Sequence, residues 1–171
     1  MKSFITYFIF LGLILAPIRF HGQKVEISKA EISFVFVSKD VKGTFSGFES
    51  ASKIDLDNLE NSIFQGSVLS KTIDSNNRLR NWSLRSGKYF DVDDFPRISF
   101  QSTHVSREGN QLKVKGELTI KQTVKPITIT FTKSQDKLIG TASLYSIDYG
   151  IKIRKKREDN LVNIKMIFDL N

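Results

Sequence analysis

The stretch at residues 111–121, QLKVKGELTIK, decides the fold because its apolar and polar residues alternate without a break. The first set is Leu112, Val114, Gly116, Leu118 and Ile120, and the second is Lys113, Lys115, Glu117, Thr119 and Lys121. A period of two is typical of a β-strand, in which successive side chains point to opposite faces. The stretch therefore predicts a strand with one buried face and one face in water.

The same alternation recurs along most of the chain from residue 24 onward. Strand-like runs cover residues 25–37, 41–48, 63–73, 97–106, 111–122, 125–133, 137–147 and 161–170, with a shorter extended piece at 50–55. The links are short and rich in turn residues, which implies antiparallel neighbours. We therefore predict an all-β fold, an up-and-down antiparallel eight-stranded β-barrel of the lipocalin-like kind. A β-sandwich is the alternative.

One segment, residues 76–85, breaks the alternation. Leu79, Trp82 and Leu84 fall there at helical spacing, which predicts one short helix. We expect the apolar side of this helix to lie on the barrel or to cap it.

The polar face of the strands indicates which side of the barrel is wet. In a membrane-embedded barrel that face would point inward and the apolar residues would face lipid. Lysines at positions 113, 115, 121 and 165 place too many charges on the polar face for a band in contact with lipid. The apolar face is therefore expected inside, in a soluble barrel.

The first 22 residues have the features of a signal peptide. A lysine at position 2 precedes an apolar run at residues 4–15, and Pro17 follows it. The run is shorter than the roughly 20 residues that a membrane-spanning helix needs. We expect residues 1–22 to be removed, leaving residues 23–171 as one domain in the periplasm or outside the cell. An uncleaved N-terminal anchor is the alternative.

The residue types needed for catalysis are scarce. The chain has no cysteine and two histidines, of which His104 is the one beyond the predicted signal peptide. We interpret His104 as a surface or partly buried side chain. Asp91, Asp93 and Asp94 lack the glycine and distal glutamate of a calcium-binding loop, so we interpret them as part of a turn before a strand. We expect no enzymatic activity, no metal and no cofactor.

The sharpest charge feature is the basic run Arg154, Lys155, Lys156 and Arg157, in a chain with net charge +8. The run is either a solvated hairpin or a point of transient contact with an anionic membrane surface. Stacking aromatic residues do not gather near it, so nucleic acid is not expected as a partner. The protein is expected to be a monomer or a homodimer.

Five ordered stretches carry a resemblance to a known family. The central one contains Leu84-Arg85-Ser86, Lys88-Tyr89-Phe90-Asp91-Val92, Phe95-Pro96 and Ile98-Ser99-Phe100; the others are 43–48, 72–74 with Asn77 and Arg80, 116–120 with 125–127, and 148–151. Together they resemble the YceI-like family of exported lipid- or polyisoprenoid-binding proteins over residues 24–171. Where that family commonly has Arg-Asp-x-His-Leu, this chain has Arg80-Asn81-Trp82-Ser83-Leu84 and so loses an acid and a histidine.

The resemblance implies a barrel with an elongated apolar interior that holds an isoprenoid or a similar amphiphile without catalysis. Burial of about 25 cal/mol per Å² of apolar surface lets a long chain bind without polar contacts. The side chains expected to line the interior are Phe34, Phe36, Phe45, Trp82, Phe100, Leu118, Phe131 and Phe168. For each of them plain core packing is the alternative, and a ligand-free envelope or stress protein that acts through protein contacts is the alternative function.

Overall fold

The computed structural model describes residues 24–170. The predicted signal peptide lies outside the described residues. The strands are β1 (Lys24–Val25), β2 (Ile27–Phe36), β3 (Val41–Phe45), β4 (Glu49–Ser50), β5 (Ile54–Asp55), β6 (Gln65–Leu69), β7 (Arg97–Glu108), β8 (Gln111–Ile120), β9 (Thr123–Ser134), β10 (Lys137–Tyr145) and β11 (Leu161–Leu170). The α-helix is α1 (Arg78–Arg85), and 3₁₀ turns cover Val37–Lys39, Leu59–Asn61, Ser70–Thr72, Ser146–Tyr149 and Glu158–Asn160.

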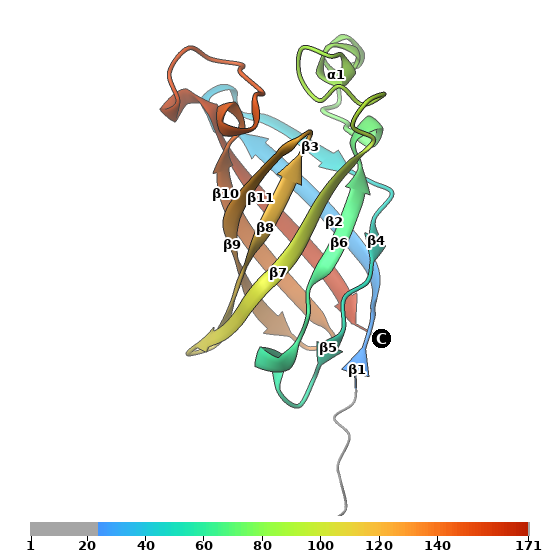
Figure 1. The fold of residues 1–171 in the computed structure, drawn as a ribbon, viewed down its shortest axis with the longest axis vertical. Helices are drawn as coiled ribbons and strands as arrows, with labels where there is room; N and C mark the ends of the chain where they lie inside the picture. The colour runs from blue at the N-terminus through green and yellow to red at the C-terminus, as the bar shows by residue number, and fades with distance from the viewer. Residues whose placement is uncertain (1–23, 171) are drawn as a thin grey trace, which may run out of the picture.

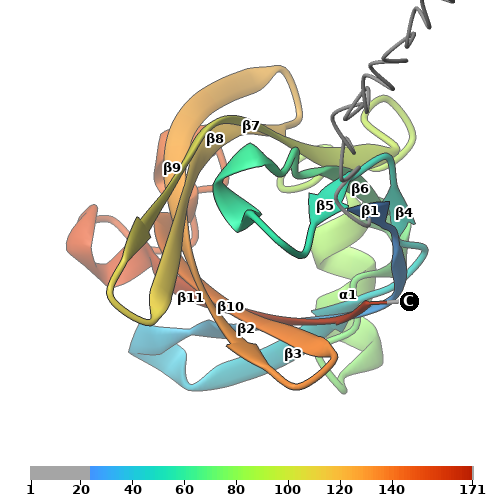
Figure 2. The ribbon, with the colours of Figure 1, turned by 90° about the horizontal axis from the view of Figure 1, so that it is seen from below.

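One antiparallel sheet of nine strands forms the body of the molecule, in the order β3-β2-β11-β10-β9-β8-β7-β6-β4. The sheet curls around the interior, as the side view and the view from below both show (Figure 1, Figure 2). The predicted fold class is confirmed, and the single continuous sheet shows that the β-sandwich alternative is wrong. All eight predicted runs contain a strand, and the extended piece at 50–55 overlaps β4 and β5. Two runs are shorter than predicted: 41–48 is a strand only at Val41–Phe45, and 63–73 only at Gln65–Leu69, because a 3₁₀ turn follows at Ser70–Thr72.

The two ends of the nine-stranded sheet approach one another without forming a continuous ladder. Strand β3 connects to the segment before α1, where Thr44 donates its backbone N–H to the Asp74 carbonyl (2.8 Å) and accepts one from Asp74 (3.0 Å). The backbone N–H of Leu69 also donates to the carbonyl of Ser46 (3.2 Å). Strand β5 pairs with β1 in a separate two-stranded sheet rather than joining the large one. The barrel is therefore closed at this seam by a few hydrogen bonds.

Helix α1 lies at one end of the barrel, as predicted for residues 76–85 (Figure 1). It begins after Asn77, whose side-chain oxygen accepts the backbone N–H of Arg80 at 2.9 Å. This contact satisfies a donor that the first helical turn leaves free. At the other end of the helix, the Arg85 guanidinium donates to the carbonyl of Ile73 (2.9 Å) and ties α1 to the preceding segment.

The face that α1 buries differs from the prediction. Asn81 and Leu84 are buried, whereas Leu79 is 81% exposed and Trp82 is 76% exposed. Asn81 turns inward because its side-chain oxygen accepts two hydrogen bonds from Ser75, from the backbone N–H (2.8 Å) and from the hydroxyl (2.7 Å). Residues 79 and 82 are three positions apart, so they share the opposite face of the helix and point outward.

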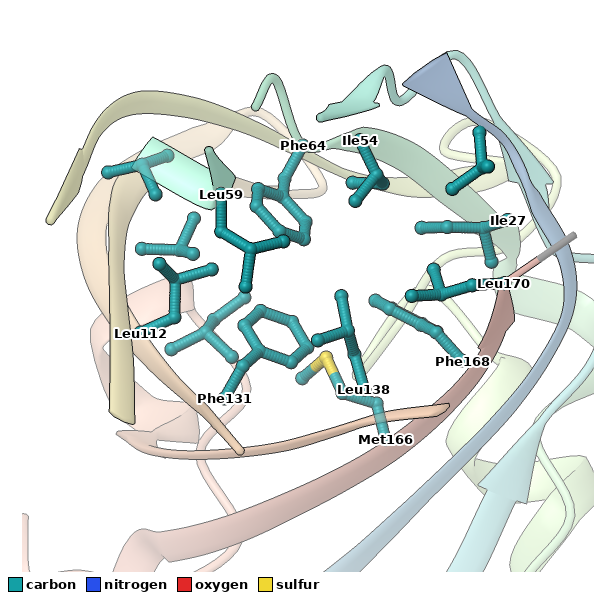
Figure 3. Packing of buried hydrophobic residues seen from close by; sticks show 14 of the residues in the cluster. Ile27, Ile54, Leu59, Phe64, Leu112, Phe131, Leu138, Met166, Phe168 and Leu170 are labelled. Atoms are coloured by element: carbon teal, nitrogen blue, oxygen red, sulfur yellow. The ribbon is translucent and has the colours of Figure 1, made fainter. Parts of the chain in front are cut away.

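The main hydrophobic core fills the end of the barrel away from α1. Figure 3 shows its side chains pointing inward from the strands around the barrel and from the segment after β5. The labelled members are Ile27, Ile54, Leu59, Phe64, Leu112, Phe131, Leu138, Met166, Phe168 and Leu170. We call this cluster the floor. A smaller buried cluster of Ile120, Tyr149 and Ile151 packs against partly buried side chains that include Tyr89 and Phe90 after the helix.

Candidate functional site

An apolar cavity of about 380 Å³ occupies the interior of the barrel between the floor and α1. All but one of the eight predicted lining residues contribute to it: Phe34, Phe36, Phe45, Phe100, Leu118, Phe131 and Phe168. Trp82 does not, because it lies on the outward face of α1. The inner face of the sheet is thus the apolar one, as the alternation predicts.

The exposure of the lining residues shows where the cavity opens. Near the floor, Phe64, Phe131 and Phe168 are buried. Toward α1 some of the lining side chains are partly exposed, as at Phe90, or exposed, as at Arg80. The cavity is therefore closed at the floor and opens at the helix end of the barrel, which we call the mouth.

Two groups of aromatic rings line the cavity at different depths. Near the mouth, the ring centroids of Phe34 and Phe45 lie 5.6 Å apart, and those of Phe45 and Phe90 lie 5.7 Å apart in an edge-on arrangement. At the floor, Phe131 stacks on Phe64 at 5.1 Å and lies 5.6 Å from Phe168. Aromatic pairs at such distances add to the stabilisation from area burial. The rings thus line the cavity in two packed groups.

Two phenylalanines of the cavity wall lie across the strands from glycines. Phe34 is paired across the strands with Gly43, and Phe131 with Gly140. A Cβ on Gly43 would lie 2.4 Å from the Phe34 ring, and one on Gly140 would lie 2.5 Å from the Phe131 ring. The two rings therefore cover the backbone of the neighbouring strand, in space that a side chain would otherwise fill.

Polar groups near the mouth come from α1 and from the Val37–Lys39 turn, where Lys39 lines the cavity. Arg80 and Ser83 line the cavity, and the Arg80 guanidinium donates to the carbonyl of Ser75 (3.3 Å). Ser83 stands where the resembling family commonly has histidine, so this position reaches the cavity as a hydroxyl. Arg80 is thus the helix residue that brings positive charge to the mouth.

Asn81, at the position of the family's acid, has a structural role. Its amide nitrogen donates to the carboxylate of Asp74 at 2.9 Å, and its oxygen binds Ser75. The hydrogen bond from Asn81, together with one from the backbone N–H of Asn76, lowers the pKa of Asp74. Asn81 therefore fixes the segment before α1 and does not face the cavity.

The prediction missed several lining residues, among them Phe48, Phe64, Tyr89 and Phe90. Phe64 could have been found, because it continues the alternation with Gly66 and Val68. Phe48 escapes that rule because Gly47, with a φ of +67°, turns the chain just before it. Tyr89 and Phe90 lie in a turn, where a period of two gives no information.

The positions considered for catalysis lie apart from the cavity. His104 is exposed on β7, and Asp91, Asp93 and Asp94 lie in the turn before that strand. Asp91 has a φ of +52°, and its backbone N–H donates to the carbonyl of Ser86 (3.0 Å). Across residues 24–170, no three His, Asp or Glu side chains gather in a way that could hold a metal ion. The interpretation of the aspartates as a turn is confirmed.

The basic run lies in a loop that is held firmly from inside. Asn160 is fully buried, and its side chain accepts the backbone N–H groups of Ile153 (3.0 Å) and Arg154 (2.9 Å). Its amide nitrogen donates to the carbonyls of Arg154 (3.1 Å) and Lys156 (2.6 Å). The backbone of the run is therefore ordered by a single buried amide, while its side chains point to solvent.

Arg157 differs from the other members of the run. Its guanidinium donates two hydrogen bonds to the Asp148 carboxylate (2.9 and 2.5 Å) and lies 3.8 Å from the centre of the Tyr145 ring. The hydrogen bonds from Arg157 lower the pKa of Asp148. Arg157 is thus neutralised locally, and Arg154, Lys155 and Lys156 remain as exposed charges.

In the described part of the chain, no helix has the length and apolar character needed to cross a bilayer.

Comparisons with known proteins agree with this architecture. Protein YceI of Salmonella arizonae is 32% identical over 87 residues, an alignment that covers 51% of this chain and 46% of that protein. The chain therefore spans about half the length of this curated relative.

Two solved structures share the fold at low sequence identity. BcnA of Burkholderia cenocepacia superposes with a TM-score of 0.73 at 19% identity, covering 86% of this chain and 99% of BcnA. A polyisoprenoid-binding domain from Saccharophagus degradans superposes with a TM-score of 0.57 at 11% identity, covering 86% of this chain and 97% of that domain.

A model of the YceI-like domain matches residues 23–170. Since this match covers nearly the whole chain, the resemblance noted in the sequence is confirmed, and the chain belongs to the YceI-like family.

Proposed function

We propose that the cavity binds a single isoprenoid or similar amphiphilic lipid by its apolar chain, without catalysis. The observation that carries this proposal is the Phe-rich cavity, closed at the floor, whose helix-borne polar residues, Arg80 and Ser83, lie at the mouth. Its volume of about 380 Å³ lies within the range of small-molecule pockets, roughly 300–1,000 Å³. A ligand bound there has its tail toward the floor and its head group toward α1.

The family and the neighbouring fold support the same ligand class. The domain from Saccharophagus degradans is described as polyisoprenoid-binding, and it shares this fold. The predicted signal peptide supports a site of action in the periplasm or outside the cell, where a carrier or store would act as a monomer or homodimer. The exposed Arg154, Lys155 and Lys156 support contact with an anionic membrane surface from which lipid is taken up.

Native mass spectrometry of protein purified from its own envelope, followed by lipid extraction, tests the proposal directly. We expect a bound mass that matches an extractable isoprenoid or related lipid. Protein that carries no lipid, and whose melting temperature does not respond to quinones, polyprenyl phosphates or fatty acids, would favour the alternative of a ligand-free protein that acts through protein contacts.

A matched pair of variants separates binding from general damage. Phe90→Gln changes a partly exposed lining residue near the mouth, and Val124→Gln makes the same kind of change at a residue 52% exposed on β9. Loss of an apolar contact of this size weakens binding of an added polyprenol about tenfold in the first variant. The second variant should bind like the wild type, and equal weakening in both would count against the cavity as the site.

A further inference from the structure

We infer that the helix end of the barrel docks onto an anionic lipid bilayer, with Leu79 and Trp82 inserted at the level of the head groups. Both side chains are large, apolar and almost fully exposed, and they lie on the same outward face of α1. Scattered exposed apolar residues are ordinary on protein surfaces. This pair is different because it lies at the mouth of an apolar cavity, on a helix with three arginines and no acidic residue.

The chemistry of α1 suits the membrane interface. Its sequence, RLRNWSLR, holds three arginines and no acidic residue. Tryptophan is enriched at the water boundary of membranes because its ring is amphipathic. Arg78 is exposed beside the apolar pair, and arginine can keep its charged group at the phosphates while its stem contacts apolar surface. The helix thus presents apolar and cationic groups to the same side.

A second basic element lies at the same end of the barrel, which makes the surface wider than the helix. Figure 1 shows the loop between β10 and β11 beside the mouth, across from α1. Inward and outward residues alternate in this loop. Ile151 and Ile153 line the cavity, whereas Lys152 and Arg154 are exposed. Lys155 and Lys156 add two more exposed charges on a backbone that Asn160 holds in place.

The opposite end of the molecule carries exposed charges of both signs. Asp57, Glu60 and Glu108 are exposed in the turns around the floor, and so are Lys53, Arg107 and Lys137. An anionic surface therefore attracts the helix end more strongly than the floor end, so the molecule is oriented with its mouth toward the lipid. This orientation would let a lipid pass between bilayer and cavity without crossing water, a consequence that rests on the proposed function.

The single tryptophan of the chain makes the inference directly testable, because all tryptophan emission comes from position 82. We expect vesicles of phosphatidylcholine mixed with an equal part of phosphatidylglycerol to shift the Trp82 emission to shorter wavelength. The protein should also sediment with these vesicles. Vesicles of phosphatidylcholine alone should do neither. Added salt should reverse the binding, because exposed charges are screened over about 10 Å at 0.1 M. Unchanged emission with the anionic vesicles overturns the inference.

Variants separate the apolar contribution to vesicle binding from the electrostatic one. Leu79→Ser should weaken partition to anionic vesicles about tenfold, and Ile63→Ser, at a residue 47% exposed near the floor, should leave it unchanged. Neutralising Arg154, Lys155 and Lys156 to glutamine should weaken it about a hundredfold, since each basic residue near such a surface contributes about fivefold. All of these side chains are exposed, so the fold is retained.

Two further outcomes distinguish docking on a bilayer from ligand binding in the cavity and from binding of a second copy of the chain. Phe90→Gln, which is designed to impair lipid binding, should dock like the wild type; loss of vesicle binding in this variant would overturn the assignment of docking to Leu79 and Trp82. Absence of vesicle binding together with self-association that Leu79→Ser abolishes would also overturn it, in favour of a second copy of the chain on this surface. Docking without any lipid in the cavity would contradict only the proposed function.

Discussion

The absence of a side chain at Gly140 leaves the space that the ring of Phe131 occupies. Gly140 faces Phe131 across the strands, and an added Cβ would lie 2.5 Å from that ring and 2.8 Å from Met166. We expect Gly140→Ala to lower the free energy of unfolding by about 1–3 kcal/mol, because the ring must leave its packed position. Alanine otherwise suits a strand at least as well as glycine, so the sign of the effect is informative.

The midpoint of urea unfolding measures this change. Gly87→Ala is the matched control, because a Cβ there meets only the Asp91 side chain at an ordinary 3.5 Å. A Gly140 variant as stable as the control would show that the ring is free to move.

Tyr149 gives a residue-level prediction about pH. Its side chain is 3% exposed, and burial raises its pKa from 10.0 to about 12. Below pH 10 the phenol is neutral in both states. Between pH 10 and 12 the unfolded chain ionises first, so stability falls by about 3 kcal/mol over this window, at 1.36 kcal/mol per pKa unit.

The difference between wild type and Tyr149→Phe isolates this contribution, because the lysines titrate in both proteins. The free energy of unfolding of the phenylalanine variant, measured by urea from pH 9 to 12, should decline less steeply. Parallel curves for the two proteins would contradict the burial of the phenol.

The accuracy of the sequence-based prediction depends on residue type and element. Alternation identifies the inward face of a long strand, so Phe34, Phe100 and Phe131 were assigned correctly to the lining. Trp82 was assigned to the same wall because apolar residues on a helix usually point to the core. In α1 the hydrogen bonds of a polar residue, Asn81, fix the orientation, and hydrophobicity alone does not contain that information.

At the level of the element, α1 and the segment before it depend on one pair of side chains. The Asn81 amide donates to the Asp74 carboxylate, which can only accept. Asn81→Asp restores the acid common in the family but places two carboxylates in contact, so we expect the melting temperature to fall by several degrees at neutral pH. Since like charges raise a carboxyl pKa, the deficit should shrink as the pH falls toward 4 and one group takes up a proton.

The reciprocal double variant, Asp74→Asn with Asn81→Asp, supplies the control. It restores one amide and one carboxylate at the same distance, so it should recover most of the lost stability at neutral pH. A double variant no better than Asn81→Asp would mean that the exchange does not reproduce the native contact and that repulsion is not the cause.

The seam of the barrel is the element-level feature that the sequence did not predict. Short links between long strands predict hairpins, and β7 to β10 follow that rule. Strand β3 has five residues and β4 has two. The connection of β3 to the segment before α1 relies on backbone hydrogen bonds between Thr44 and Asp74. Backbone bonds of this kind leave no side-chain pattern, which explains why a fully closed set of eight strands was expected.

At the scale of the whole molecule, we assign fold stability to the floor and lipid binding to the mouth. The floor holds the fully buried rings, with Phe131 at 1% exposure between Phe64 and Phe168. The mouth holds partly exposed rings, such as Phe90, whose packing leaves room for a ligand. The same substitution should therefore have different consequences at the two ends.

We expect Phe131→Ala to lower the free energy of unfolding by about 3–5 kcal/mol, as for other buried aromatic residues, and Phe90→Ala to lower it by less. For polyprenol binding by the folded protein, we expect the opposite ranking of the two variants. Phe90→Ala should bind more weakly, whereas Phe131→Ala, with an enlarged interior, should keep most of its affinity. Urea unfolding and titration calorimetry on the two variants measure both quantities. If one variant were the worse in both measurements, fold stability and lipid binding would depend on the same residues, and the division of the barrel into a structural floor and a binding mouth would be wrong.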